Sequence, residues 1–290
     1  MRSPLFISST FLPDQSLLRT ALDICDGLEI DGVELGSNHC YEPNYEYLSN
    51  YDFRYLTHNY FPIPEEGFVV NIASNDDVIQ DQSLKHIFRA IDFTADMGGE
   101  LYTFHPGFRS DPDGAARTDK NYDFAFSQDL EHASSDAATE RMYASLDTIV
   151  AHARKRNVSI AIETEGSVRH HRQLLMQQIE EFGRFMSRYS SQEVGINLNI
   201  GHLNLASKTF NFEPGDFVEL VKSHVIAMEL SHNLGTEDSH LPLEADQWYW
   251  PQIFQPDLAN VPKILEFRDA SRKQLESNIE LFRRTENEFC

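Results

Sequence analysis

The sequence is poor in cysteine and in basic residues, and it lacks long apolar runs. Its 290 residues include only Cys25, Cys40 and Cys290, which are widely spaced and form no C-x-x-C pair. This spacing suggests neither a disulfide framework nor a zinc ribbon, so we expect free thiols. No apolar run approaches the roughly 20 residues that cross a bilayer, and the stretch after Met1 is too short for a signal-peptide core. We therefore expect a cytoplasmic protein with no membrane partner.

Positive charge is also scarce. The chain has 24 lysines and arginines against 46 aspartates and glutamates, a formal net charge of -22. Such a surface repels phosphate groups unless a local basic patch outweighs it, and the basic groups at 154–156 and 169–172 have acidic neighbours. The glycine-rich nucleotide loops and the G-x-S-x-G nucleophile elbow are absent as well. We expect no nucleic-acid partner and neither nucleotide-dependent nor serine-hydrolase chemistry.

Short apolar segments alternate along the chain with segments of helical period. The apolar segments predict eight strands, near residues 5–9, 31–36, 54–58, 100–105, 158–163, 194–199, 225–230 and 262–267. Helices are expected between them, around Leu18 and Ile87 and at 140–155, 173–188, 214–222 and 271–284. Parallel strands need such crossover connections, and eight of them close most economically into a (β/α)8 barrel. The predicted fold class is therefore α/β, a single TIM-barrel domain over residues 1–290.

Seven of the predicted strands end in a carboxylate, an amide or an imidazole. The active site of such a barrel lies at the carboxyl ends of its strands, so these side chains are expected to meet there. They are Glu34, His58, His105, Glu163, Asn199, Glu229 and Glu266. The sequence thus predicts a ring of metal-ligating or acid–base groups at one face of the barrel.

Two long connections interrupt the regular alternation. Residues 107–136 are rich in Asp, Ser, Gly and Ala and follow the fourth strand, so we expect a lid or a disordered segment at the barrel mouth. Its basic side chains would either meet an anionic substrate or be solvated. Residues 233–260 carry Trp248 within a Trp-Tyr-Trp cluster. These rings would stack on a sugar, cover a contact in a homo-oligomer, or pack the loop against the barrel rim.

Several short motifs occur in one order along the chain. They are Phe104-His105-Pro106-Gly107, Ile162-Glu163-Thr164-Glu165-Gly166, Asn199-Ile200-Gly201-His202, Ser231-His232-Asn233-Leu234-Gly235 with Glu237-Asp238-Ser239-His240-Leu241-Pro242, and Glu266. Together they resemble the xylose-isomerase-like TIM-barrel superfamily over about residues 5–284. That superfamily includes sugar isomerases, ketose 3-epimerases, inosose dehydratases and metal-dependent apurinic endonucleases. The resemblance implies a small polyol or sugar substrate.

The resemblance also implies a divalent cation held at the ends of strands five to eight. Transferred to this chain, its ligands are Glu163, Asn199, Glu229 and Glu266. Asn199 stands where the family usually has Asp, and Glu229 where it usually has His. The two departures leave the summed charge of the ligands unchanged and make the set all oxygen, which favours Mn2+ or Mg2+ over Zn2+. The alternative is that the metal is lost and a carboxylate cluster remains.

Six further side chains are expected to contact the substrate. His58 and His105 would donate to substrate hydroxyls, as in the epimerases, or hold further metals, as in the endonucleases. His202 fits the family's D-x-x-H pattern, and His240 resembles part of a D-x-H loop motif. The full set is His58, His105, His202, His240, Glu34 and Trp248.

The chemistry that fits these residues is proton transfer at a carbon beside a carbonyl, as in a sugar isomerase or epimerase. A cation that bridges the carbonyl and the adjacent hydroxyl would stabilise an enediolate, and Glu163 and Glu266 would remove and return the proton. Three alternatives stay open: dehydratase or lyase chemistry, a metal-free barrel that binds a sugar or a protein, and apurinic endonuclease activity. The acidic surface and Glu229 disfavour the endonuclease.

Overall fold

A closed parallel sheet forms the centre of the molecule. The computed structural model describes residues 2–112, 114–117, 122–125, 135–166 and 173–289. Eight parallel strands pair in the order β1-β10-β9-β8-β7-β4-β3-β2 and close into a barrel. Their bounds are β1 Leu5–Ser8, β2 Gly32–Leu35, β3 Arg54–His58, β4 Leu101–Phe104, β7 Ser159–Glu163, β8 Gly195–Asn199, β9 Val225–Leu230 and β10 Lys263–Leu265. All eight predicted strands and the TIM-barrel fold class are confirmed.

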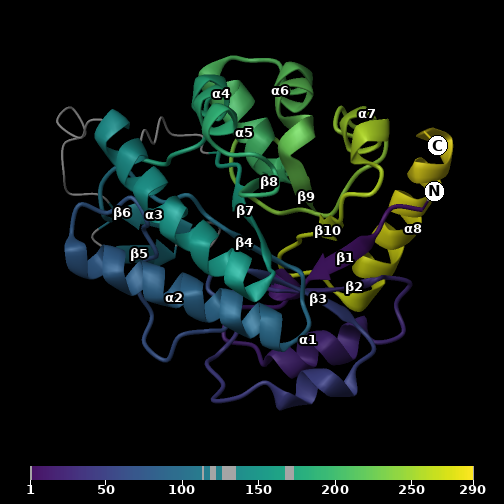
Figure 1. Ribbon diagram of the computed structural model, residues 1–290. Coiled ribbons are helices and arrows are strands. Elements are labelled where there is room, and N and C mark those ends of the chain that lie inside the picture. Colours follow the sequence, from purple (N-terminus) through teal and green to yellow (C-terminus); the bar gives the residue numbers. More distant parts are fainter. Residues whose placement is uncertain (1, 113, 118–121, 126–134, 167–172, 290) are drawn as a thin grey trace.

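The barrel closes between its first and last strands. In this seam Leu5 of β1 pairs with Lys263 of β10. Next to it the backbone N–H of Ser3 donates to Glu286 at 2.6 Å, and Arg283 donates to the Ser3 carbonyl at 2.8 Å. Figure 1 accordingly shows the two ends of the chain side by side. The seam is therefore held by contacts between opposite ends of the sequence.

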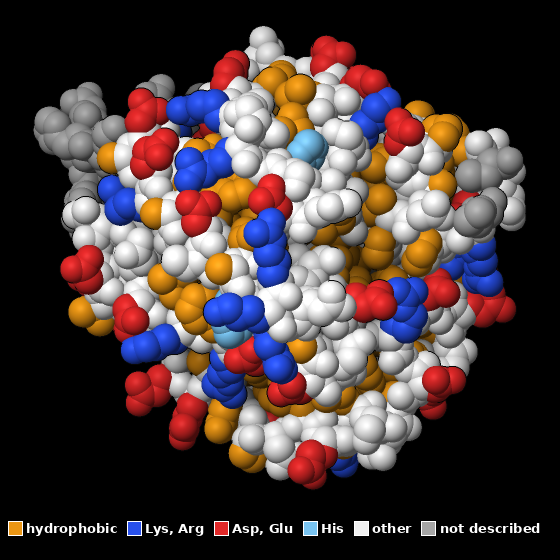
Figure 2. Space-filling view, in the orientation of Figure 1, with side chains coloured by type: hydrophobic (Ala, Val, Ile, Leu, Met, Phe, Trp, Pro, Cys, Tyr) orange, Lys and Arg blue, Asp and Glu red, His pale blue; other side chains and the backbone are white. Residues whose placement is uncertain are grey.

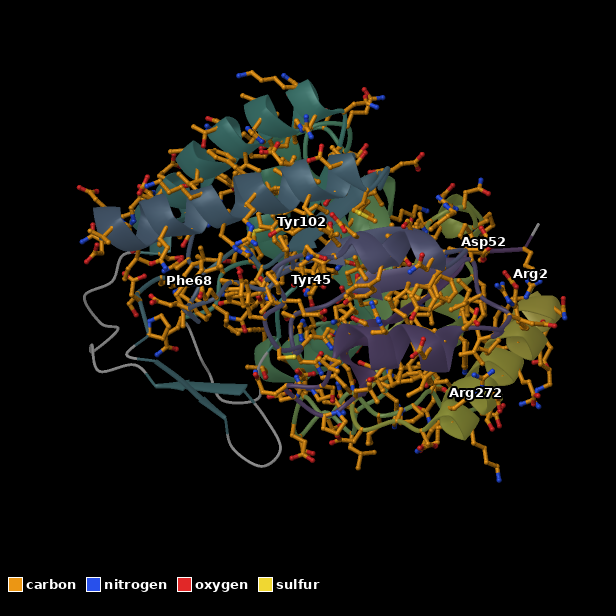
Figure 3. All side chains as sticks on the ribbon, turned by 90° about the horizontal axis from the view of Figure 1, so that it is seen from below. Arg2, Tyr45, Asp52, Phe68, Tyr102 and Arg272 are labelled. Atoms are coloured by element: carbon orange, nitrogen blue, oxygen red, sulfur yellow. The ribbon has the colours of Figure 1, made fainter. Side chains whose placement is uncertain are left out.

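Helices cover the outside of the barrel (Figure 1). They are α1 Leu18–Cys25, α2 Asp77–Asp96, α3 Ser135–Arg156, α4 Ile179–Arg188, α5 Ile200–Phe210, α6 Pro214–Val221, α7 Trp250–Ile253 and α8 Arg272–Phe289. Arg272, labelled in Figure 3, donates from the start of α8 to the carbonyls of Ile24 and Asp26 at 2.9 and 3.1 Å. The first and last helices are thereby joined. After β2 the connection contains only a 3-10 helix, Glu46–Asn50.

The helix predicted at 173–188 begins only at Ile179. The carboxylate of Glu181 accepts hydrogen bonds from the backbone N–H groups of Gln177 and Gln178, both at 2.9 Å, so it caps the new helix end. Just before them Met176 has a φ of 60°, a left-handed conformation that no helix continues. Local side-chain capping therefore overrides the apolar period that suggested an earlier start.

The long connection at 107–136 is not simply unstructured. It contains the antiparallel pair β5 Gly114–Arg117 and β6 Tyr122–Ala125, while residues 118–121 and 126–134 lie outside the described residues. The other connection holds α7 and a 3-10 helix at Pro256–Leu258, and His232 pairs with Leu241 in an antiparallel bridge. This bridge returns the intervening loop to the end of β9.

The helices and the surface charge of the described residues are expected to fit a protein with no membrane partner. Within the described residues, no helix is both long and apolar enough to cross a bilayer. On the face drawn in Figure 2, lysine and arginine side chains are scattered among aspartates and glutamates. That arrangement agrees with the strongly acidic composition.

Candidate metal centre and acid–base site

The alternation of side chains along each barrel strand builds the site. Neighbouring side chains on a strand point to opposite faces, so residues two apart share the barrel interior. A separate apolar cluster fills the lower interior: Phe6, Leu56, Leu101, Ala161, Ala227 and Ile264. Two residues further along these strands stand Ser8, His58, Thr103, Glu163, Glu229 and Glu266. Each of these six strands thus supplies one packing residue and then one polar residue above it.

Glycine at the start of β2 makes room for this layer. A Cβ on Gly32 would lie 2.6 Å from the ring of Phe6 and 2.0 Å from the carbonyl oxygen of Arg54. Only glycine lets β2 approach so closely, and Glu34 then follows on the same inward side. Glu34 is fully buried, as are Asn199 and Glu229. The strand ends therefore meet in a compartment shielded from water.

His58, His105 and Glu163 form the first imidazole–carboxylate cluster. The Nε2 atoms of both histidines lie 3.6 Å from Glu163 Oε2, and this buried oxygen has no hydrogen-bond partner within the described part of the chain. The ligand atoms of a four-coordinate ion, each about 2.1 Å from it, stand about 3.4 Å apart. The spacing is too long for hydrogen bonds and suits a divalent cation.

The remaining nitrogens of these two histidines are held by neighbours. His58 Nδ1 lies 2.8 Å from Thr103 Oγ1, and His105 Nδ1 lies 2.6 Å from Glu165 Oε1. Both contacts leave Nε2 facing Glu163. A carboxylate or hydroxyl behind the distal nitrogen is the usual way in which a metal-binding histidine is oriented. These partners therefore strengthen the case for a cation site.

His202, Asp238 and His240 form the second cluster. Asp238 Oδ2 lies 2.8 Å from His240 Nε2 and 3.5 Å from His202 Nε2. His202 Nδ1 lies 2.9 Å from the carbonyl oxygen of Thr164 and 3.0 Å from Glu163 Oε1, which links the two clusters. In this second group, His202 Nδ1 and His240 Nε2 already lie within hydrogen-bond distance of oxygen atoms. Its ligand atoms nevertheless lie within 4.8 Å of one another, as those of the first cluster do.

Glu34 joins the site through a third group. Its carboxylate, His58 and Glu229 bring ligand atoms within 4.8 Å of one another, and all three side chains are buried. The structure therefore brings together all seven strand-end side chains, with His202 and His240 beside them. Buried His and Glu clusters of this kind suit a metal ion.

Asn199 differs from the sequence-based expectation in the atom that it presents. Its Nδ2 lies 2.9 Å from Glu163 Oε1, 2.9 Å from Glu229 Oε2 and 3.2 Å from Glu266 Oε2. The amide oxygen instead accepts the backbone N–H of His202 at 3.1 Å. The four residues converge as expected, but an amide nitrogen rather than an oxygen faces the three carboxylates.

The environment separates the buried carboxyl groups into two kinds. Burial, followed by the charge of Glu266, raises the pKa of Glu34 to about 8. Burial and the neighbouring carboxylates also raise the pKa of Glu229 well above its usual range. Burial opposes ionisation of Glu163 and Glu266 too, but the imidazoles that face them lower the pKa of both. Such a divergence is typical of sites that combine acid and base chemistry.

Burial also opposes the charged form of the histidines. It lowers the pKa of His58. At His105 the charges of Glu163 and Glu165 outweigh burial and raise the pKa to about 9. The charges of Asp238 and Glu266 likewise outweigh burial at His240 and raise its pKa to about 9. Without a bound cation, the carboxylates thus favour the protonated form of His105 and His240 but not that of His58.

Trp248, the aromatic candidate for substrate contact, packs against the apolar core and its neighbour Tyr249. It is half-buried, and its ring packs edge-to-face on Tyr249 with centroids 5.8 Å apart. The two residues after it are buried at 1% and 2% exposure, where Trp250 stacks on Phe254. Most of the aromatic cluster therefore packs the loop against the barrel.

Three side chains at the site were not predicted from the strand ends. Glu165 and Thr103 orient the imidazoles of the first cluster, and Asn197 donates to Glu229 Oε1 at 2.7 Å. Each lies two residues along the chain from a predicted site residue at the same strand end: Glu165 from Glu163, Thr103 from His105, and Asn197 from Asn199. The strand period of two is the sequence signal that could have found them.

Comparison with known sequences supports the same fold. The family model described as a xylose isomerase-like TIM barrel matches residues 28–285. The uncharacterised protein y4fM of Sinorhizobium fredii is 27% identical over 173 residues, which is 59% of this chain and 47% of y4fM. The match therefore spans about half the length of that curated relative.

Solved structures share the architecture over nearly the whole chain. A D-tagatose 3-epimerase-like protein has a TM-score of 0.76 at 19% identity, with 98% of each chain covered. A putative xylose isomerase from Rhodospirillum rubrum has a TM-score of 0.70 at 14% identity, with 99% of each chain covered. D-psicose 3-epimerase from Clostridium cellulolyticum H10 has a TM-score of 0.67 at 11% identity, with 98% of this chain and 99% of the other covered. These identities show the fold alone, whereas the family model spans most of the sequence, so the chain belongs to the xylose isomerase-like TIM-barrel family.

Proposed function

We propose that this protein is a divalent-metal-dependent isomerase or epimerase that moves a proton beside the carbonyl of a sugar or a sugar derivative. The observation that carries the proposal is the placement of two carboxylates around one point. Glu163 from β7 and Glu266 from the end of β10 lie 2.9 and 3.2 Å from the same Asn199 nitrogen, with β8 and β9 between their strands. Removal and return of a proton at one carbon needs two such groups. Solved structures of similar fold, one named as a 3-epimerase and one as 3-epimerase-like, support the same chemistry.

The cation would be held by His58, His105 and Glu163. Two imidazole nitrogens and one carboxylate favour Zn2+ or Mn2+ over Mg2+. This metal preference differs from the preference for Mn2+ or Mg2+ that the all-oxygen set of Glu163, Asn199, Glu229 and Glu266 implies. When bound, the ion would supply positive charge that polarises a substrate carbonyl. The buried Glu163 Oε2, which has no hydrogen-bond partner in the described part of the chain, supports this part of the proposal, because an unsatisfied buried acceptor is costly.

The other side chains orient the reacting groups. His240 Nδ1 lies 3.1 Å from Glu266 Oε2, an ion-pair distance at which its charge would keep that carboxylate ionised. Glu266 exchanges the proton with the substrate carbon on one face of the substrate. Glu163 exchanges it on the opposite face. His202 and Glu34 would bind substrate hydroxyls, and Trp248 is the candidate ring for stacking on a sugar face. These roles define a small polyhydroxylated substrate.

The test combines metal analysis with hydrogen exchange. The chain is purified without chelator, its metal is counted by elemental mass spectrometry, and metal-loaded protein is incubated with ketoses and keto-inositols in D2O. We expect deuterium beside the carbonyl of at least one compound, and a loss of about 100-fold or more in Glu266→Gln. Glu280→Gln, which removes an exposed charge from α8, is the matched control and should exchange normally. Absence of exchange with every compound by metal-loaded wild type would overturn the proposal.

Two imidazole clusters also favour a second candidate, metal-dependent cleavage of phosphodiesters at abasic DNA sites. Their nitrogen ligands are suited to zinc. The scattered basic side chains in Figure 2 and the net charge of -22 weigh against a DNA-facing surface. Nicking of an abasic duplex by the zinc-loaded chain, without deuterium exchange into sugars, would support this candidate instead.

A further inference from the structure

The side chain of Asn199 stands at the centre of three carboxylates. Its Nδ2 lies within hydrogen-bond distance of one oxygen each from Glu163, Glu229 and Glu266. The carboxylates come from β7, β9 and the end of β10, and Asn199 itself ends β8. Three carboxylate oxygens that converge on one point from adjacent strands form the pattern expected around a cation. Here the point is a neutral amide with two N–H donors.

Neighbouring contacts fix which end of the amide faces the carboxylates. Asn199 is the N-cap of α5, and its Oδ1 accepts the otherwise unpaired backbone N–H of His202 at 3.1 Å. Turning the amide around would set Oδ1 against three carboxylate oxygens and Nδ2 against the N–H of His202. Both changes bring like groups together in a buried place, which is costly.

The distances distinguish an amide from a metal ligand. Carboxylate oxygens bind Mg2+ at about 2.1 Å and Ca2+ at about 2.3–2.6 Å, whereas the three oxygens lie 2.9–3.2 Å from nitrogen. An amide N–H donor carries no lone pair for a metal. An aspartate at this position could cap α5 with one oxygen and bind a cation with the other. Asparagine can satisfy only the first of these demands while its nitrogen faces the carboxylates.

We propose that the Asn199 amide replaces a cation among Glu163, Glu229 and Glu266, so that this position of the chain binds no divalent ion. Any cation bound by the site then lies in the imidazole clusters. The inference deepens the proposed function, on which it rests only for the presence of a cation. It turns one residue, Asn199, into the determinant of how many metal ions the barrel holds.

Glu266 provides the decisive variant. Among the described residues, three groups of side chains bring metal-ligating atoms together, and Glu266 belongs to none of them, whereas Glu163 and Glu229 each belong to one. If the carboxylates around Asn199 held a metal, removal of the Glu266 charge would weaken it. If the amide takes that place, Glu266→Gln leaves metal binding by the cluster of His58, His105 and Glu163 unchanged, since Glu266 contacts His240 of the other cluster instead.

The experiment counts bound Mn2+ by electron paramagnetic resonance of the free ion. Wild type, Glu266→Gln, Asn199→Asp and the double variant Asn199→Asp/Glu266→Gln are titrated with Mn2+, and circular dichroism confirms that each is folded. We expect equal stoichiometry for wild type and Glu266→Gln, one additional Mn2+ per chain for Asn199→Asp, and loss of that additional ion in the double variant. Asn197→Asp is the matched control. It adds the same charge beside Glu229, two residues earlier on β8, and should gain no ion.

Two results would overturn the inference. One is a wild-type Mn2+ site that Glu266→Gln weakens tenfold or more. The other is equal stoichiometry for wild type and folded Asn199→Asp. The Glu266→Gln comparison does not require Asn199→Asp to fold. A wild type that binds no Mn2+, beside an Asn199→Asp variant that binds one, would support the inference while contradicting the metal-dependent function.

Discussion

His39 is expected to make the stability of the protein depend on pH. It is 2% exposed, its Nε2 lies 2.9 Å from Ser9 Oγ, and its Nδ1 lies 3.2 Å from the carbonyl oxygen of Ser16. The carbonyl only accepts, so Nδ1 carries the hydrogen and the Ser9 hydroxyl donates to Nε2. Burial holds this ring neutral and lowers the pKa of His39 to about 4.

The sign of the effect follows from the lowered pKa. As the pH falls from 6.5 toward 4, the unfolded chain takes up a proton at His39 before the folded chain does, so stability is lost over this window and is fully present above it. A difference of about 2.5 pKa units corresponds to about 3 kcal/mol over the whole window. Between pH 8 and pH 5 the loss from His39 alone is about 2 kcal/mol.

The measurement is urea unfolding of wild type and His39→Gln at pH 8 and pH 5. Other groups titrate in the same range, so the quantity of interest is the wild-type loss minus the loss in the variant. We expect the wild type to lose about 2 kcal/mol more. His86, whose pKa burial also lowers to about 4, gives an independent repeat with His86→Gln. Parallel losses in wild type and both variants would refute the reasoning.

Three further changes test how loops and helices hold the site. Asn71→Ala removes acceptors for the N–H groups of Ala73 and Phe108 and a donor to Asp111, so urea unfolding should show a loss of about 3 kcal/mol. Glu181→Ala uncaps α4 and should cost about 1–2 kcal/mol in the same assay. Gly166→Ala would place a Cβ 2.1 Å from the carbonyl oxygen of His202, and a shift of that segment should reduce deuterium exchange about 100-fold in a folded chain.

Each of these changes has a clear contrary result. An unchanged urea midpoint in Asn71→Ala would mean that water replaces the lost hydrogen bonds. Equal stability of Glu181→Ala and Glu181→Gln with wild type would remove the capping argument. Full exchange activity in Gly166→Ala would show that the backbone of His202 can move without disturbing the reacting groups.

The barrel strands could be predicted because they are short, apolar and separated by helical segments. Their terminal polar residues could be placed together for the same reason, since parallel strands of one barrel end at one edge. Helix α5 was not predicted because it begins at Ile200, directly after β8, with no loop between them. Asn199 ends the strand and caps the helix at once, so no turn residues mark the boundary.

The chemistry at the strand ends was harder to predict than their position. Whether His58 and His105 bind substrate or a cation depends on Thr103 and Glu165, which fix their distal nitrogens in the folded protein. The direction of the Asn199 amide depends on the N–H of His202, a contact made only once α5 has formed. A sequence motif specifies only residue types. Neither the orientation of the imidazoles nor that of the Asn199 amide could therefore be predicted from it.

The seam between β1 and β10 determines when the site can exist. Glu266 follows β10, and β10 must pair with β1 across almost the whole length of the chain before the ring of carboxylates is complete. During synthesis the amino-terminal strands emerge first, and until the last strand arrives β1 and β9 have open edges that can pair with other chains. Such distant pairing is slow. The repulsion among the buried carboxylates is therefore deferred to the final closing step, so charge-removing substitutions at the strand ends should speed barrel closure.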